Sequence, residues 1–196
     1  MKDIFWAILK LIAFIFILPL IIATVTAFQS AILSLPPNKD AWLLWGAGTY
    51  VALKLFVYDF KEVYTFGNNC IDKVVSFFKP AGYMLPIYSV ILVMIYVITL
   101  IIGRGAAFAP YFLFFFAFTL SMHLIMTAHE IYEADKSILK AHYLFVFGSL
   151  MVFNFIMMAL LLAWALPEYS LIAFIKNLSA QTVHMYKWVY KILFVD

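Results

Sequence analysis

The stretch IFWAILKLIAFIFILPLIIATVTAF, residues 4–28, contains a single charged side chain, Lys10. A helix of about 20 apolar residues crosses the ~30 Å hydrocarbon layer of a bilayer. The stretch is longer than the apolar core of a secretory signal peptide, which has roughly 7–15 residues, and no cleavage site of small residues follows it closely. We therefore expect a membrane span that the mature protein retains.

Four further apolar runs follow, at residues 41–58, 83–102, 106–128 and 141–166. Hydrophobic residues make up 67% of the 196 residues and charged residues only 12%, which is more apolar surface than a soluble domain of this size can bury. The runs do not alternate as barrel strands do, and helices satisfy their own backbone groups in lipid. The sequence predicts an all-α polytopic membrane protein with five spans, in one domain over residues 1–168.

Residues 169–196 have a different pattern from the five runs. Apolar and aromatic side chains recur there at helical spacing among Lys176, Lys187 and Lys191. This pattern is typical of an amphipathic helix that lies at the membrane interface. A helix that binds a partner protein has the same pattern, so both alternatives stay open.

Small residues indicate where helices approach one another closely. Gly46 and Gly48 lie in the second run, and Gly103 and Gly105 flank Arg104 between the third and fourth runs. Small residues let helix backbones meet in membranes. We expect the first pair to pack within the chain and the second pair to form a tight helical hairpin.

The charged residues indicate orientation and partners. With a cytoplasmic N-terminus, eight of the 13 Lys and Arg residues face inward and five outward. The net charge of +3 is spread along the chain and does not favour nucleic-acid binding, and the single cysteine, Cys70, excludes an intrachain disulfide. We expect a bacterial inner-membrane protein whose partners are membrane lipid and other membrane protein subunits.

Polar residues gather in two segments, and the second of them contains a candidate metal site. His129 and Glu133 are four residues apart, so they share one face of a helix and could together bind zinc or iron. Glu130 is a candidate base beside them. His123, six residues before His129, is a further candidate ligand, although the helical angle between the two histidines is unfavourable.

The same segment has a simpler interpretation, which we favour. An acidic turn between two spans is solvated, and its carboxylates pair with Lys136 and Lys140. On this interpretation no cofactor is expected, and zinc or iron at His129 and Glu133 is the alternative.

The first polar segment, residues 59–73, carries a recognisable pattern. Val63-Tyr64-Thr65-Phe66-Gly67 is followed at once by Asn68-Asn69-Cys70-Ile71-Asp72, and Tyr83-Met84-Leu85-Pro86-Ile87-Tyr88 comes soon after. Taken alone, the polar residues would only cap or solvate a short helix. The arrangement resembles small integral-membrane metallopeptidase-like proteins related to the site-2 proteases. In that family a Tyr-x-Phe-Gly run precedes the zinc motif His-Glu-x-x-His.

The resemblance implies a degenerate zinc motif. Asn68 stands at the first histidine position, Asn69 at the catalytic glutamate and Asp72 at the second histidine. A neutral amide is a poor zinc ligand, and Asn69 cannot accept a proton from a metal-bound water. The resemblance therefore implies a pseudoenzyme without catalytic residues, in which a cavity facing these three positions could hold a peptide or a lipid without cleaving it.

Three classes of function follow from these observations. We favour a non-catalytic integral membrane subunit or scaffold of a larger assembly, with a pseudo-metallopeptidase layout. The first alternative is a membrane metalloenzyme that uses His129 and Glu133, with Asp72 as a further ligand. The second is a supporting subunit of a transport complex. The span interiors hold few of the ionisable residues that a transport pathway needs, so we do not expect this chain to transport a substrate by itself.

Overall fold

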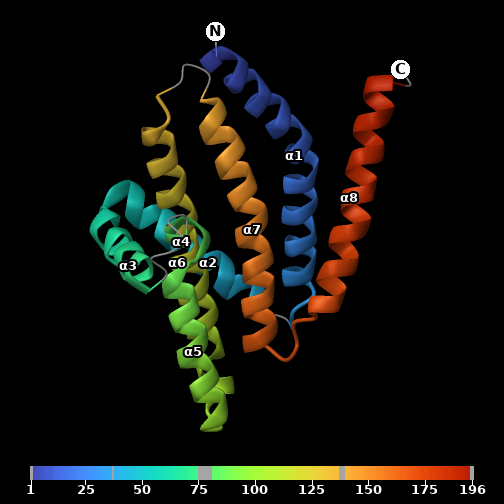
Figure 1. Cartoon of the computed structure of the whole chain (residues 1–196). Helices are drawn as coiled ribbons and strands as arrows, with labels where there is room; N and C mark the ends of the chain where they lie inside the picture. The colour runs from blue at the N-terminus through green and yellow to red at the C-terminus, as the bar shows by residue number, and fades with distance from the viewer. Residues whose placement is uncertain (1, 37, 75–80, 137–139, 195–196) are drawn as a thin grey trace. The chain divides into compact units, whose positions relative to one another are not determined.

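The computed structural model describes residues 2–36, 38–74, 81–136 and 140–194. Within these ranges the secondary structure is helical and no strand is present (Figure 1). The helices are α1 (Lys2–Leu33), α2 (Lys39–Phe56), α3 (Lys61–Val74), α4 (Ala81–Met84), α5 (Ile87–Ile101), α6 (Gly105–Ala134), α7 (Ala141–Ala165) and α8 (Leu171–Phe194). The all-α prediction is confirmed.

Among the described residues, three helices are long and apolar enough to cross a membrane: Ile4–Leu33, Ala107–Ala134 and Ala141–Ala165. They correspond to the first, fourth and fifth predicted runs. One further pair of helices is long and apolar enough to cross a membrane only when taken together: Lys39–Phe56 and Lys61–Lys73. The chain bends by 119° between the two. The count is therefore three spans, or four if the bent pair is a single broken span.

The third predicted run differs most from the structure. Pro86 stands at the N-cap of α5 with φ −74° and ψ 79°, so it ends the short helix α4 and separates it from α5 instead of kinking one continuous helix. Proline has no N–H, and it disfavours the helical conformation in the residue before it. At 1.5 Å per residue, the 15 residues of α5 extend about 22 Å, which is short of a ~30 Å hydrocarbon layer. The five-span count is not confirmed.

The hairpin predicted between the third and fourth runs is confirmed. α5 ends at Ile101 and α6 begins at Gly105. Gly103 has φ +78°, in the left-handed region that glycine adopts without steric cost. The backbone N–H of Arg104 donates to the carbonyl of Thr99 at 2.9 Å and closes the end of α5.

The chain divides into two compact units, to both of which α6 and α7 contribute. The first contains Met1–Ser34, Ala128–Leu160 and Tyr169–Asp196. Here α7 packs on α1: a Cβ on Gly148 would lie 3.2 Å from the Phe14 ring, and the rings of Phe28 and Phe155 meet edge to face at 5.2 Å. α8 also packs on α1.

The second unit contains Leu35–Thr127 and Leu161–Glu168. Its core includes Tyr50, Tyr64, Met122 and Met126, each at most 2% exposed. The partly buried aromatic rings of Phe60, Tyr88 and Phe118 pack around this cluster. α2, α3, α5 and α6 therefore share one core in this unit.

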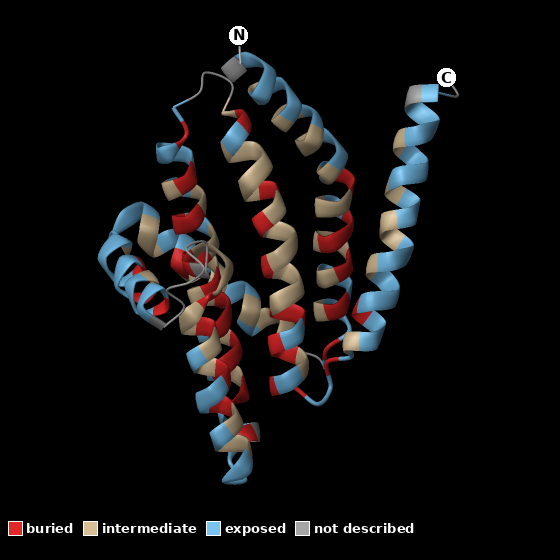
Figure 2. Ribbon diagram, viewed as in Figure 1, coloured by how far each residue is buried: buried red, intermediate tan, exposed pale blue. Residues whose placement is uncertain are grey.

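Much of the apolar side-chain surface faces outward (Figure 2). On α1, Phe5 is 63% exposed and Phe16 is 66% exposed, and on α7 Trp164 is 59% exposed. Extended exposed apolar surface on a single chain is the mark of contact with lipid or with partner helices. The burial pattern therefore agrees with the membrane character that the composition predicts.

The glycine pair of α2 gives a matched test of packing in the second unit. A Cβ on Gly46 would overlap the backbone carbonyl of Phe114 in α6, whereas a Cβ on Gly48 would meet nothing within 4 Å. We expect Gly46→Ala to lower the free energy of unfolding by about 1–3 kcal/mol, because the helices must move apart. Thermal unfolding of the detergent-solubilised protein would measure this.

Gly48→Ala is the control for that substitution. It adds a methyl group to open space and should be neutral, or stabilising by up to about 1 kcal/mol, because alanine is the better helix former. Equal effects of the two substitutions would show that α2 does not pack on α6 at Gly46.

Candidate functional site

α3 is an amphipathic helix, and one of its faces packs against the other helices of the second unit. Tyr64, Gly67 and Ile71 are buried along this face, at the spacing of successive helical turns. Asp59 lies just before α3, and its carboxylate accepts hydrogen bonds from the Lys61 N–H at 3.3 Å and from Lys54 Nζ at 2.5 Å. The chain therefore turns from α2 into α3 at an ion pair.

Asn68, Asn69 and Asp72, the three positions that the sequence resemblance suggested as a degenerate motif, have different environments on α3. Asn68 is half-buried and faces the protein, whereas Asn69 and Asp72 are exposed. Gly67, just before them, fits tightly: a Cβ there would lie 2.7 Å from the Tyr88 ring and 2.9 Å from Ile87. The motif segment is thus held against α5 through Gly67, with only Asn68 of the three polar positions turned inward.

Asn68 lines a small cavity, of about 10 Å³, enclosed by α3, α5 and α6. Its other lining residues are Tyr64, Pro86, Ile87, Tyr88, Thr119, Met122 and His123. A space of this volume holds about one water molecule. The enclosed cavity next to Asn68 is therefore too small for a peptide or a lipid.

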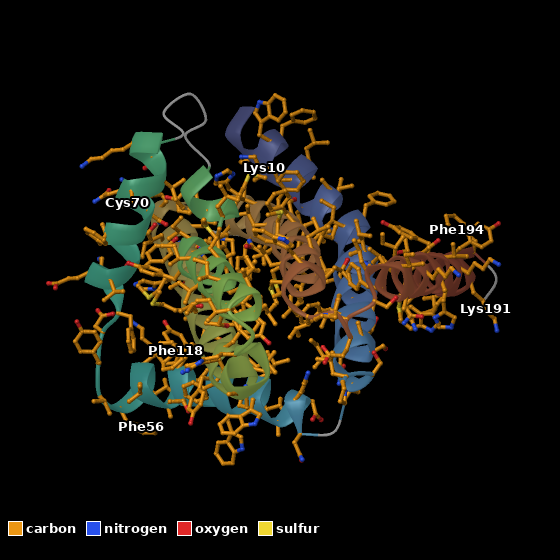
Figure 3. The ribbon with its side chains drawn as sticks, turned by 90° about the horizontal axis from the view of Figure 1, so that it is seen from below. Lys10, Phe56, Cys70, Phe118, Lys191 and Phe194 are labelled. Atoms are coloured by element: carbon orange, nitrogen blue, oxygen red, sulfur yellow. The ribbon has the colours of Figure 1, made fainter. Side chains whose placement is uncertain are left out.

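A polar stripe on α6 borders this cavity. Thr119, His123 and Thr127 are four residues apart in turn, so they lie on one face of the helix. His123 and Thr127 are buried, at 4% and 1% exposure. Figure 3 shows how densely the side chains of α5 and α6 fill the space next to α3. We refer to Thr119, His123 and Thr127 as the α6 stripe.

Each residue of the α6 stripe bonds to a different helix. The Thr119 hydroxyl is 3.0 Å from Ser89 Oγ of α5, and the Thr127 hydroxyl is 2.8 Å from Tyr64 Oη of α3. His123 Nε2 donates to the Tyr83 carbonyl of α4 at 3.1 Å. Because a carbonyl only accepts, this bond places a proton on Nε2.

Tyr88 adds a fourth link in the same region. Its hydroxyl donates to the Val63 carbonyl of α3 at 2.5 Å. Tyr83 and Val63 thus both offer backbone carbonyls that side chains of other helices satisfy. The bond to Tyr83 is partly buried and the bond to Val63 is exposed, and both link the interrupted segment from α3 to α5.

The cavity next to Asn68 is lined mostly by side chains that are poor ligands for a metal ion. A catalytic zinc site takes three protein ligands, usually histidine, carboxylate or thiolate. The cavity offers one imidazole, one amide, hydroxyl groups and a thioether, a set that does not fit zinc. Among the described residues, no group of three or more His, Cys, Asp or Glu side chains is placed to hold a metal ion.

Asn69 borders a larger hollow on the outer face of α3. This open groove has a volume of about 700 Å³ and is lined by Tyr58, Asp59, Lys61, Glu62, Thr65, Phe66 and Asn69. Its walls carry charges of both signs. A ligand that contacted the motif segment would meet this groove before the enclosed cavity beside Asn68.

The second polar segment places His129 and Glu133 together, as predicted. His129 Nε2 is 3.2 Å from Glu133 Oε1 on one face of α6, and both side chains are about half exposed. Glu130 is partly buried and has an interaction partner. The pair could supply two ligands to a metal, and the third candidate on the same helix, His123, is instead buried in the second unit.

The turn after α6 contains a capping residue that the sequence interpretation did not identify. Asp135 is buried, and its carboxylate accepts a hydrogen bond from the Tyr143 N–H at 2.8 Å, at the start of α7. Lys140 Nζ donates to the carbonyls of Tyr132 and Asp135 and lies 4.2 Å from the centre of the Tyr132 ring. Lys140 therefore helps to close the end of α6.

Comparison with known proteins found no match of this chain to a protein-family model, to a curated protein or to a solved structure.

His123 offers a test of the α6 stripe. We expect His123→Ala to lower the free energy of unfolding by about 1–3 kcal/mol, because the buried imidazole is lost and the partly buried Tyr83 carbonyl loses this donor. His123→Gln keeps an N–H donor and should retain part of that stability. Chemical or thermal unfolding of the solubilised protein would measure both variants.

His129→Ala is the matched control on the same helix. Its side chain is about half exposed, so its removal should change stability by no more than about 0.5 kcal/mol. If His123→Ala is as mild as His129→Ala, the bond to Tyr83 contributes nothing to the fold.

Proposed function

We propose that this chain is a non-catalytic integral membrane subunit or scaffold of a larger assembly. The observation that carries the proposal is the α6 stripe. Its three polar side chains bond to hydroxyl and carbonyl groups of α3, α4 and α5. These three side chains of the second unit are engaged in holding helices together, and that is the behaviour of a structural element.

The surroundings of the motif segment support the pseudo-metallopeptidase part of the proposal. Asn68 cannot supply a strong metal ligand, and Asn69 has no acid–base chemistry at neutral pH. The enclosed cavity at Asn68 holds about one water, so a scissile peptide does not fit inside it. In this proposal the segment has kept its place in a peptidase-like scaffold, and packing through Gly67 has replaced hydrolysis.

The proposal includes the five-span topology with a cytoplasmic N-terminus in a bacterial inner membrane. In this topology α2 and α5 are membrane spans in addition to α1, α6 and α7. Exposed apolar side chains on both helices support this, among them Trp45, which is 69% exposed, and Ile98, which is 54% exposed. The excess of Lys and Arg on the proposed inner side supports the orientation.

Exposed aromatic residues support assembly with other membrane proteins. Trp45, Trp164 and Trp188 are each more than half exposed, on three different helices. Tryptophan is enriched both at membrane interfaces and at the energetic centres of protein contacts. A supporting subunit of a transport complex falls within this proposal.

A second candidate function rests on the His129–Glu133 contact. The two side chains meet at 3.2 Å and remain open to ligands from outside. A membrane metalloenzyme could use them to hold zinc or iron, with Glu130 as the base and the remaining ligands, Asp72 among them in the sequence interpretation, drawn from elsewhere.

One purification distinguishes the two candidates. The chain is extracted from native membranes in mild detergent, and native mass spectrometry gives its subunit ratio while elemental analysis gives its metal content. A subunit or scaffold should emerge with a second membrane protein at a fixed whole-number ratio. A chain recovered alone, with lipid only, would contradict the proposal.

Metal content decides the second candidate. One zinc or iron per chain that is lost in His129→Ala, and kept in His184→Ala, would favour the metalloenzyme over the scaffold. His184 is a suitable control because it is an exposed histidine on α8. A preparation with less than about a tenth of an equivalent of metal would remove the metalloenzyme from consideration.

A further inference from the structure

α8 and α1 form a two-helix arrangement within the first unit. α8 packs on α1 and runs in the opposite direction, and the two helices diverge toward the C-terminal end of α8 (Figure 1). Phe174, near the start of α8, is 1% exposed. Farther along, the Tyr186 hydroxyl donates to the Phe16 carbonyl of α1 at 2.7 Å. α8 is thus anchored to α1 by packing at one end and by a hydrogen bond farther on.

Pro19 interrupts the backbone hydrogen bonding of α1 near its contact with α8. A proline inside a helix removes the N–H that would pair with the carbonyl four residues earlier, here that of Ile15, and disturbs the neighbouring turn. Phe16 is the next residue, and its carbonyl accepts the hydrogen bond from Tyr186. The proline therefore sits where α8 makes its polar contact with α1.

A groove opens between the two helices beside this contact. Its volume is about 610 Å³, within the range of ligand sites. Ile15, Phe16 and Pro19 line it from α1, and Tyr186, Lys187 and Val189 are among the residues that line it from α8. The walls are mostly apolar and carry one charge, on Lys187.

The charge of α8 is of one sign. Every charged side chain in α8 is a lysine: Lys176, Lys187 and Lys191. Lys187 lines the groove, and Lys191 is four residues after it, so the two lysines lie on the same side of the helix. Figure 3 shows Lys191 and Phe194 near the C-terminal end of α8, and Phe194 lines the groove.

We propose that the groove between α1 and α8 binds an anionic phospholipid, with an acyl chain against Ile15, Pro19 and Val189 and the phosphate at Lys187 and Lys191. Charge complementarity selects an anionic headgroup. The apolar wall formed by α1, a helix able to span a membrane, selects a hydrocarbon chain. Exposed Tyr186, Trp188 and Tyr190 are the aromatic residues that favour the headgroup region.

This inference is independent of the proposed scaffold function and goes beyond a helix resting on a membrane surface. It identifies a site with a lipid class, a chain position and two phosphate ligands. A free phosphate would satisfy the lysines and leave the apolar wall uncovered. An acidic partner helix would satisfy the lysines and displace the lipid.

The test is a lipid titration of the full-length protein in detergent, followed by native mass spectrometry. Phosphatidylglycerol and phosphatidylcholine with the same acyl chains are compared. We expect phosphatidylglycerol to bind at least tenfold more tightly. Each lysine near an anionic headgroup contributes about 1 kcal/mol, so Lys187→Gln together with Lys191→Gln should weaken phosphatidylglycerol binding roughly tenfold to thirtyfold.

Lys176→Gln is the matched control, because Lys176 is on the same helix but eleven residues before Lys187, about 16 Å along the helix axis. It should leave the preference unchanged, and circular dichroism should show that all variants keep their helix content. Equal binding of the two lipids, or equal effects of Lys176→Gln and the double variant, would overturn the proposal.

Two further experiments test whether free phosphate or a partner helix occupies the groove instead. Excess inorganic phosphate should leave phosphatidylglycerol bound, because the acyl chain supplies part of the affinity; displacement by phosphate would overturn the lipid site. A photo-crosslinker at Val189 should capture lipid in native membranes. Capture of a protein chain at Val189 would assign the groove to a partner helix and overturn the lipid.

Discussion

The second unit depends on the hydrogen bonds that the α6 stripe makes to the interrupted segment formed by α3, α4 and α5. A chain that breaks its helices in apolar surroundings exposes backbone carbonyls that need donors. His123 supplies one to Tyr83, and the hydroxyls of Thr119 and Thr127 bond to Ser89 and Tyr64. One continuous helix thus bonds to polar groups of three neighbouring helices.

This arrangement gives the polar positions near the motif segment a physical role. Gly67 brings α3 into close contact with Tyr88 and Ile87, and the Tyr88 hydroxyl returns to the carbonyl of Val63. Asn68 completes the wall of a cavity that holds about one water. In the resembled peptidases this segment would carry the zinc motif. We propose that in this chain the segment serves to pack α3 against α5.

The sequence was sufficient for the long helices, because a run such as residues 4–28 can be stable in lipid only as a helix. It was insufficient for α5, because a proline within an apolar run can either kink a helix or end it, and tertiary contacts decide which. At Pro86 the helix ends. The α6 stripe is visible in the sequence as polar residues four apart, but the sequence does not show which helices they bond to. The capping role of Asp135 could not be read, since it depends on where the next helix begins.

The buried bond between Tyr64 and Thr127 is the most direct test of the claim that the α6 stripe holds α3 in place. A double-mutant cycle with Tyr64→Phe and Thr127→Val removes each hydroxyl singly and both together. A buried hydrogen bond of this kind should appear as a coupling free energy of about 0.5–1.5 kcal/mol in unfolding measurements on the solubilised protein. Strictly additive effects of the two substitutions would contradict the account.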